Sequence, residues 1–170
     1  MATAIARVAL AAVLVVGCTL SDCTEFPRSA EAYRQQATAA GSVETFEASR
    51  PLRDVAATFR DRASSCLQDL VTTTVSGPTH RLMMTKNSFH PTVVVTDRKA
   101  ELQVQMRPES GLQLVELPEN GFLVLVAQAS ALDGRRTRIE IFGSSFFYSR
   151  LYTAVRGWAA GTSTACPDMS

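Results

Sequence analysis

The sequence predicts an α+β domain: an antiparallel β-meander sheet covered on one face by two amphipathic helices. Two stretches, 52–67 and 147–159, carry apolar residues at the three- and four-residue steps of a helix. Between them lie short runs of β-forming residues separated by turn sequences, which is typical of antiparallel hairpins. The fold class follows from a block of strands with one helix before it and one after it.

A short strand at 43–48 and a helix are the first expected elements. Ser49 is positioned to cap the helix, Pro51 falls in its first turn, and Asp54 lies near the positive end of its dipole. The polar side of the helix carries both signs of charge, so we interpret its apolar stripe as a core face rather than a membrane or partner face. The stripe is Leu52, Val55, Ala56, Phe59, Ala63, Cys66 and Leu67.

A run of strands should follow this helix. The turn sequences 118–121 and 132–135 lie between runs that should pair as hairpins, which favours a meander. Apolar and polar residues alternate in 101–106 and 137–142, so one face of the sheet should be buried and the other wetter. The expected strands are 70–75, 81–85, 101–106, 112–117, 122–129 and 137–142.

The second helix is expected near the C-terminus. Ser144 or Ser145 can cap it, and Gly161 can end it. The aromatic residues of this segment could line a ligand pocket or stack on sugars, but aromatics at helical spacing usually belong to a core, and we assign them there. The core side is Phe147, Leu151, Val155, Trp158 and Ala159, and the other aromatics of the segment are Phe146, Tyr148 and Tyr152.

The first residues of the chain resemble a bacterial lipoprotein signal. Arg7 gives a weakly positive start, 8–16 are apolar, and Val15-Val16-Gly17-Cys18 is similar to a lipobox. An ordinary signal peptide fits less well because Val15 spoils the small-x-small cleavage pattern. A transmembrane helix needs about 20 apolar residues, and this run is shorter. The resemblance implies cleavage after Gly17 and lipidation of Cys18.

The same resemblance implies a location. Thr19, rather than Asp, follows the lipidated cysteine, which implies attachment to the inner leaflet of the outer membrane, facing the periplasm. The chain would then divide into a signal peptide at 1–17, a lipidated N-terminus and flexible tether at 18–41, and one globular domain at 42–170. As a coil, the tether would reach roughly 25–30 Å.

Two further expectations concern the tether and the fold. Ser29 could cap a short helix at 30–40, but an isolated helix of this length is marginal in water. The order of elements resembles helix-grip modules of outer-membrane assembly lipoproteins, a likeness of fold that implies no function.

Export would place the remaining cysteines in an oxidising compartment, where disulfides persist. We expect Cys66 to pair with Cys166, because Cys66 ends the first predicted helix, Cys166 lies in the C-terminal tail, and both border the domain. Cys23 would be left over in the tether. The alternative is a buried, unpaired Cys66.

Composition and motifs argue against several classes of function. The chain has 17 Lys and Arg and 16 Asp and Glu, so losing Arg7 with the signal leaves a neutral protein. Its basic residues are scattered, and we expect no nucleic-acid partner. His80 and His90, the two histidines, lie in loop-like surroundings without metal-ligand spacing, and we expect no metal or cofactor.

Motifs for hydrolysis are incomplete. The segment 143–147 reads Gly-Ser-Ser-Phe-Phe and lacks the second glycine of a nucleophile elbow, so no catalytic residues are assigned. A carboxylate pair for glycoside cleavage could be drawn from several residues whose separation the sequence does not reveal. They are Glu101, Glu109, Glu116, Glu119 and Glu140.

We therefore expect a lipid-anchored cell-envelope protein that is not an enzyme and that binds or scaffolds another envelope component. Two alternatives stay open. A small envelope hydrolase would place His80 or His90 beside a serine or carboxylate in a deep pocket. A carrier of a hydrophobic small molecule would need a cavity between the sheet and the helices.

Overall fold

The computed structural model describes residues 26–68, 71–76, 83–109 and 118–168. Within these ranges the chain is an α+β fold built on an antiparallel sheet, as the sequence predicted. The predictions for the strand 112–117 and for Cys18, Cys23, His80 and Glu116 lie outside the described residues.

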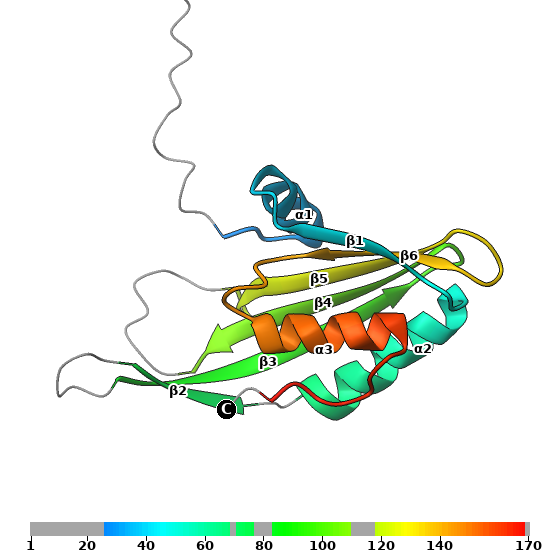
Figure 1. The fold of residues 1–170 in the computed structure, drawn as a ribbon. Helices are drawn as coiled ribbons and strands as arrows, with labels where there is room; N and C mark the ends of the chain where they lie inside the picture. The colour runs from blue at the N-terminus through cyan, green and yellow to red at the C-terminus, as the bar shows by residue number, and fades with distance from the viewer. Residues whose placement is uncertain (1–25, 69–70, 77–82, 110–117, 169–170) are drawn as a thin grey trace, which may run out of the picture.

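Six strands of the described chain form one sheet in the order β1-β6-β5-β4-β3-β2, and every neighbouring pair is antiparallel (Figure 1). Strands β2 to β6 are neighbours in chain order and form the predicted meander, while β1 joins its β6 edge. The strands are β1 Val43–Ala48, β2 Val71–Ser76, β3 Met83–Val95, β4 Lys99–Pro108, β5 Phe122–Ala131 and β6 Thr137–Phe142.

Strand β3 is longer than the run 81–85 that the sequence predicted. It continues through His90 and Pro91, so the loop-like surroundings expected for His90 are wrong. The pairing with β2 stops at Ser88, and among the described residues no strand pairs with the rest of that side of β3. A proline is tolerated at such a position because no ladder bond needs its missing N–H.

Helices α2 and α3 pack with the sheet into the main core. Helix α2 spans Leu52–Arg62 and continues as a π-helical turn at Ala63–Leu67, and α3 spans Ser149–Ala160 (Figure 1). The predicted alternation is confirmed in β4 and in β6 up to Ile141, whose alternate apolar side chains are buried on this face. Fully buried members of the cluster are Val55, Phe59, Leu67, Leu102, Val104, Ile139, Ile141, Leu151, Val155 and Trp158.

Both helices begin later than the serines predicted to cap them. Helix α2 begins after Pro51, whose carbonyl oxygen accepts the N–H of Asp54 at 3.0 Å, so Ser49 is not its cap. Helix α3 begins after Tyr148, so neither Ser144 nor Ser145 caps it. Its end is as predicted, because the C-cap residue Gly161 is left-handed with φ 74°.

The segment predicted to be a tether contains a helix that belongs to the folded domain. Helix α1 spans Ala30–Ala39, and Ser29 caps it by accepting the N–H of Ala32 at 3.1 Å. The prediction of a flexible tether therefore does not hold for 30–39, because contact with the sheet stabilises a helix that would be marginal alone. The contact between α1 and the sheet forms a second, smaller apolar cluster. It consists of Ala37, Leu123, Val126 and Phe142, with Ala30, Tyr33 and Val43 packed against it.

The strand residues of this second cluster alternate with those of the main core. Val126 neighbours Leu125 and Ala127 along β5, and Phe142 follows Ile141 along β6, and successive side chains of a strand point to opposite faces. Helix α1 therefore lies on the face of the sheet opposite to α2 and α3.

Two contacts fasten α2 and its π-helical turn to the C-terminal part of the chain, which is α3 and the segment after it. The structure contains the predicted disulfide between Cys66 and Cys166. Arg50 bridges the two core helices, since its Nη1 donates to the carbonyl oxygen of Trp158 at 2.7 Å and its Nη2 donates to Thr58 Oγ1 at 2.9 Å.

Candidate functional site

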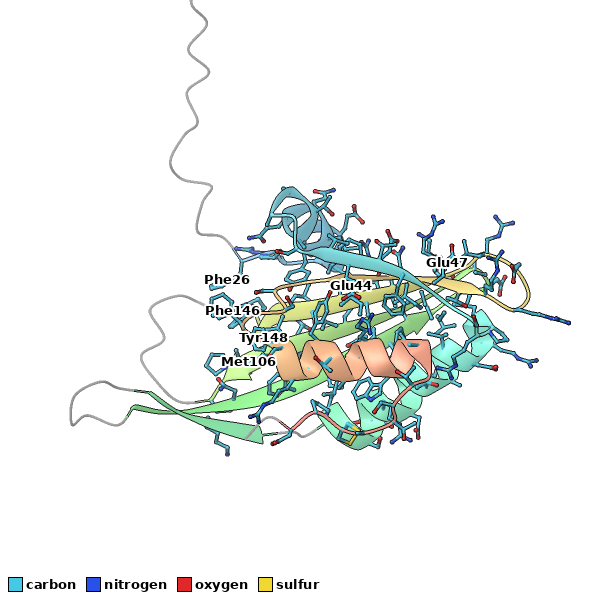
Figure 2. All side chains as sticks on the ribbon, in the orientation of Figure 1. Phe26, Glu44, Glu47, Met106, Phe146 and Tyr148 are labelled. Carbon is cyan, nitrogen blue, oxygen red and sulfur yellow. A yellow bond between two sulfur atoms is a disulfide. The ribbon has the colours of Figure 1, made fainter. Side chains whose placement is uncertain are left out.

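Two aromatic side chains project into solvent at one end of the molecule. Phe146 is 84% exposed and Phe147 is 78% exposed, and their rings meet edge to face with centroids 5.3 Å apart. Figure 2 shows Phe146 at the same end of the sheet as Phe26, where the described chain begins. The sequence placed both rings in a helical core, which is wrong because α3 begins only at Ser149.

An apolar groove of about 250 Å³ opens at this end, between α1 and the adjoining ends of β5 and β6. Phe26, which is 41% exposed, stacks on Phe122 with ring centroids 5.0 Å apart. The wall of the groove reaches Ser144, two residues before Phe146. We call this combined surface of Phe26, Phe122, Phe146, Phe147 and the groove the aromatic end.

A β-bulge shapes the groove. Val104 pairs with Leu125, but Gln105 pairs with Leu123, so Val124 is an extra residue in β5. The carbonyl oxygen of Val124 accepts the hydroxyl of Tyr33 at 2.7 Å. This hydrogen bond fastens α1 to the sheet at the bulge.

Gly143 ends β6 at the same place. Its φ is 139°, and a Cβ atom there would lie 2.9 Å from both Tyr33 Oη and the Val124 carbonyl oxygen. Its N–H donates to the carbonyl oxygen of Ser42 at 3.0 Å. The groove therefore depends on a residue without a side chain at this position.

The tyrosines of this end are neutral over the physiological pH range. Burial raises the pKa of Tyr33 to about 12. Burial also raises the pKa of Tyr148. Tyr33 therefore stays a hydroxyl donor to the bulge, and its ring presents an uncharged wall to the groove.

His90, one of the two candidate histidines, lies in β3 beside a serine and a carboxylate. Ser88 Oγ lies 3.1 Å from His90 Nε2 and donates to the carboxylate of Glu109. In a catalytic triad the imidazole stands between the hydroxyl and the acid and takes the hydroxyl proton. Here the hydroxyl lies between the imidazole and the acid and donates its hydrogen bond to the carboxylate, so the imidazole is not placed to take the hydroxyl proton. The candidate Glu119 lies in the turn before β5.

Two other candidate carboxylates share one face of the sheet. Glu101 on β4 and Glu140 on β6 are both register partners of Gln128 on β5. Arg34 and Gln103 donate to the oxygens of Glu101, and Gln128 Nε2 donates to Glu140 at 3.2 Å. These carboxylates are engaged by neighbouring side chains, whereas a glycosidase pair must face its substrate.

The aromatic end is the feature that sequence reasoning missed. A signal was present, because Phe146, Phe147 and Tyr148 are consecutive. Successive residues of a helix point about 100° apart, so a single core stripe cannot bury all three.

Three further comparisons concern metal binding, membrane crossing and similarity to known proteins. Within the described ranges, no three His, Cys, Asp or Glu side chains form a group that could hold a metal ion. In that same part of the chain, no helix combines the length and the apolar character needed to cross a bilayer. The chain matches no protein-family model, no curated protein and no solved structure.

Proposed function

We propose that the mature chain is a lipid-anchored cell-envelope protein with a binding or scaffolding role. It is attached through Cys18 to the inner leaflet of the outer membrane and faces the periplasm. The lipobox-like motif at 15–18 supports the anchor. The single observation that carries the binding role is the aromatic end, because exposed apolar surface of this kind marks interaction sites.

The position of the aromatic end suits a protein that works close to a membrane. Phe26 stacks on the sheet only eight residues after Cys18. A component bound in the groove beside Phe26 would be held near the anchor. We propose that this component is another molecule of the envelope.

The hydrolase and carrier alternatives have weaker support. The hydroxyl of Ser88 is turned toward Glu109, as described above. A carrier needs a cavity between sheet and helices, and that space is occupied by the fully buried side chains of Trp158, Phe59 and Leu102.

The anchor is tested by expressing the full chain in a bacterium that processes lipoproteins. Intact mass and membrane fractionation are compared for the wild type, Cys18→Ser and Cys23→Ser. We expect the wild type and Cys23→Ser to begin at residue 18 with an added acyl mass, and Cys18→Ser to lose the acyl group. Cys23→Ser is the matched control, because it removes a cysteine from the same segment. An unacylated wild type overturns the proposed anchor.

The binding role is tested with a photo-crosslinking residue in place of Gln36, an exposed residue that lines the groove. The control carries the same crosslinker in place of Arg135, an exposed residue of the β5–β6 hairpin loop. We expect a discrete adduct in cells only from position 36. Equal labelling from both positions, or none from position 36, contradicts binding in the groove.

A further inference from the structure

The aromatic pair Phe146–Phe147 differs from the groove beside it, because its rings project outward. Both belong to the turn between Gly143 and α3, and each exposes more than three quarters of its surface. We propose that this pair inserts into the interfacial layer of the bilayer that holds the anchor, so that the aromatic end is the membrane-docking face of the domain. The inference rests on the proposed anchoring at Cys18. Aromatic rings are favoured at the level of the lipid headgroups.

Chain length ties this end of the domain to the bilayer. Phe26 follows Cys18 by eight residues, which span at most about 26–29 Å in any conformation. Strand β5 alone, Phe122–Ala131, is roughly 30 Å long. An anchor at Cys18 therefore holds Phe26 within about 29 Å of the attachment point, so the Phe26 end of the sheet can reach the bilayer while the opposite end points away.

The exposed phenylalanines of the described ranges all belong to the aromatic end, whereas the opposite end carries ion pairs. At the β5–β6 hairpin, Arg136 forms ion pairs with Asp133 at 2.7 Å and with Glu47 at 3.3 Å. Figure 2 shows Glu47 at the far end of the sheet from Phe26 and Phe146. Charged residues belong in water and phenyl rings at an interface, so this polarity favours a bilayer under the aromatic end.

Because the rings of Phe146 and Phe147 project from the surface, a lipid bilayer is a better binding partner for them than a protein is. Two rings that project from a turn need a complementary pocket in a protein, whereas a fluid bilayer accommodates them without one. Neither ring of the pair lines the groove, so the groove remains open for the envelope component of the proposed function.

Depth-dependent quenching tests the docking face. The full-length gene carrying Phe147→Trp is expressed, and the processed protein is reconstituted into phosphatidylethanolamine and phosphatidylglycerol vesicles. These vesicles carry bromine either near the headgroup or near the chain end. We expect the introduced tryptophan to lose emission with the shallow bromine and to lose less with the deep one. Trp158, the one natural tryptophan, is fully buried and gives a constant background.

Leu132→Trp is the matched control. Leu132 is an exposed apolar residue like Phe147, at 37% exposure, but it lies in the hairpin loop at the charged end. We expect the emission of this variant to be unchanged by either bromine. A second variant combines Phe146→Ser with Phe147→Trp, so that it keeps the introduced fluorophore but loses one of the two rings. Its tryptophan should lose less emission with the shallow bromine than that of Phe147→Trp alone.

The outcomes separate this inference from the proposed function. Acylated Phe147→Trp protein whose introduced tryptophan is not quenched overturns membrane docking and leaves the anchor intact. Emission shifted to the blue without bromine quenching shows that a second copy or another protein covers the pair, and this also overturns it. If intact mass shows no acylation, the anchor fails; the unacylated Phe147→Trp protein is then mixed with the same vesicles, where quenching supports the docking face and its absence overturns it.

Discussion

At the scale of single residues, Gly143 controls how closely α1 approaches the sheet. It stands where the end of β6, the bulge carbonyl of Val124 and the hydroxyl of Tyr33 converge. Its φ is positive, and two oxygen atoms lie 2.9 Å from the position that a Cβ atom would take, which leaves no room for a side chain. The cost of a side chain here is therefore both conformational and steric.

Gly143→Ala should lower the free energy of unfolding by at least about 1–3 kcal/mol, since backbone strain alone costs that much. The loss is measured by urea unfolding, as a lower midpoint concentration with an unchanged dependence of the unfolding free energy on urea. Gly134→Ala is the control, because nothing lies within 4 Å of a Cβ at that exposed loop position, and its effect should stay within about 0.5 kcal/mol. Equal effects of the two substitutions contradict the crowding at Gly143.

At the scale of elements, Glu44 joins the edge strand β1 to α3. Arg156 Nε donates to one carboxylate oxygen at 2.7 Å, and the Tyr152 hydroxyl donates to the other at 2.9 Å. The hydrogen bond from Arg156, followed by that from Tyr152, lowers the pKa of Glu44 below its ordinary value of 4.5, although burial opposes the shift. Burial and the same contact raise the pKa of Tyr152.

The lowered pKa fixes the direction of a pH dependence. Glu44 stabilises the fold fully above pH 4.5, and this contribution is lost as pH falls through its lower folded-state pKa. Glu44→Gln should therefore be less stable than wild type near neutral pH, and the difference should shrink as the solution becomes more acidic. Urea unfolding across that range measures the difference.

Glu47→Gln is the control for this effect, on the same strand. Its carboxylate is 51% exposed and pairs with Arg136 at 3.3 Å, and such exposed pairs contribute little. Its difference from wild type should stay near zero at every pH. A Glu44→Gln difference that does not vary with pH contradicts the assigned ion pair.

Helix α1 shows why part of the element pattern could not be predicted. The positions that dock it are Ala30, Tyr33 and Ala37, which form a weak apolar stripe with only one large side chain. Its stability comes from Leu123, Val126 and Phe142 on the sheet, and those residues share a face only once the β5 bulge and the β6 register are known. By contrast, strong local patterns predicted β1, the α2 stripe and the β5–β6 hairpin.

The first residues of the helices could not be predicted from the sequence either, and this affects the candidate site. Serine can cap a helix at several positions, and the structure uses Ser29 but neither Ser49, Ser144 nor Ser145. The later start of α3 is what leaves Phe146 and Phe147 outside the core. The sequence contained the residues of the aromatic end, but their exposure depended on where the helix began.

At the scale of the whole molecule, the disulfide joins the π-helical turn that follows α2 to the C-terminal segment. Cys66 and Cys166 are separated by 100 residues, and cross-linking so long a loop restricts the unfolded chain. Replacing both by alanine should lower the free energy of unfolding by roughly 2–5 kcal/mol. Urea unfolding under non-reducing conditions measures the loss.

Cys23→Ser is the matched control and should unfold like the wild type. Adding reductant to the wild type should reproduce the destabilisation of the double alanine variant, and it should not change that variant further. Unchanged unfolding of the double variant contradicts a stabilising role for the disulfide.

The same disulfide decides which parts of the chain carry tension. Strands β2 to β6 and helix α3 all lie between Cys66 and Cys166, inside a covalently closed ring. A pull between the N-terminal end and the C-terminus passes directly from one cysteine to the other and bypasses everything in the ring. Of the described helices and strands, only α1, β1 and α2 lie outside the ring. Under such a force we expect β1 to separate from β6 while the meander stays folded.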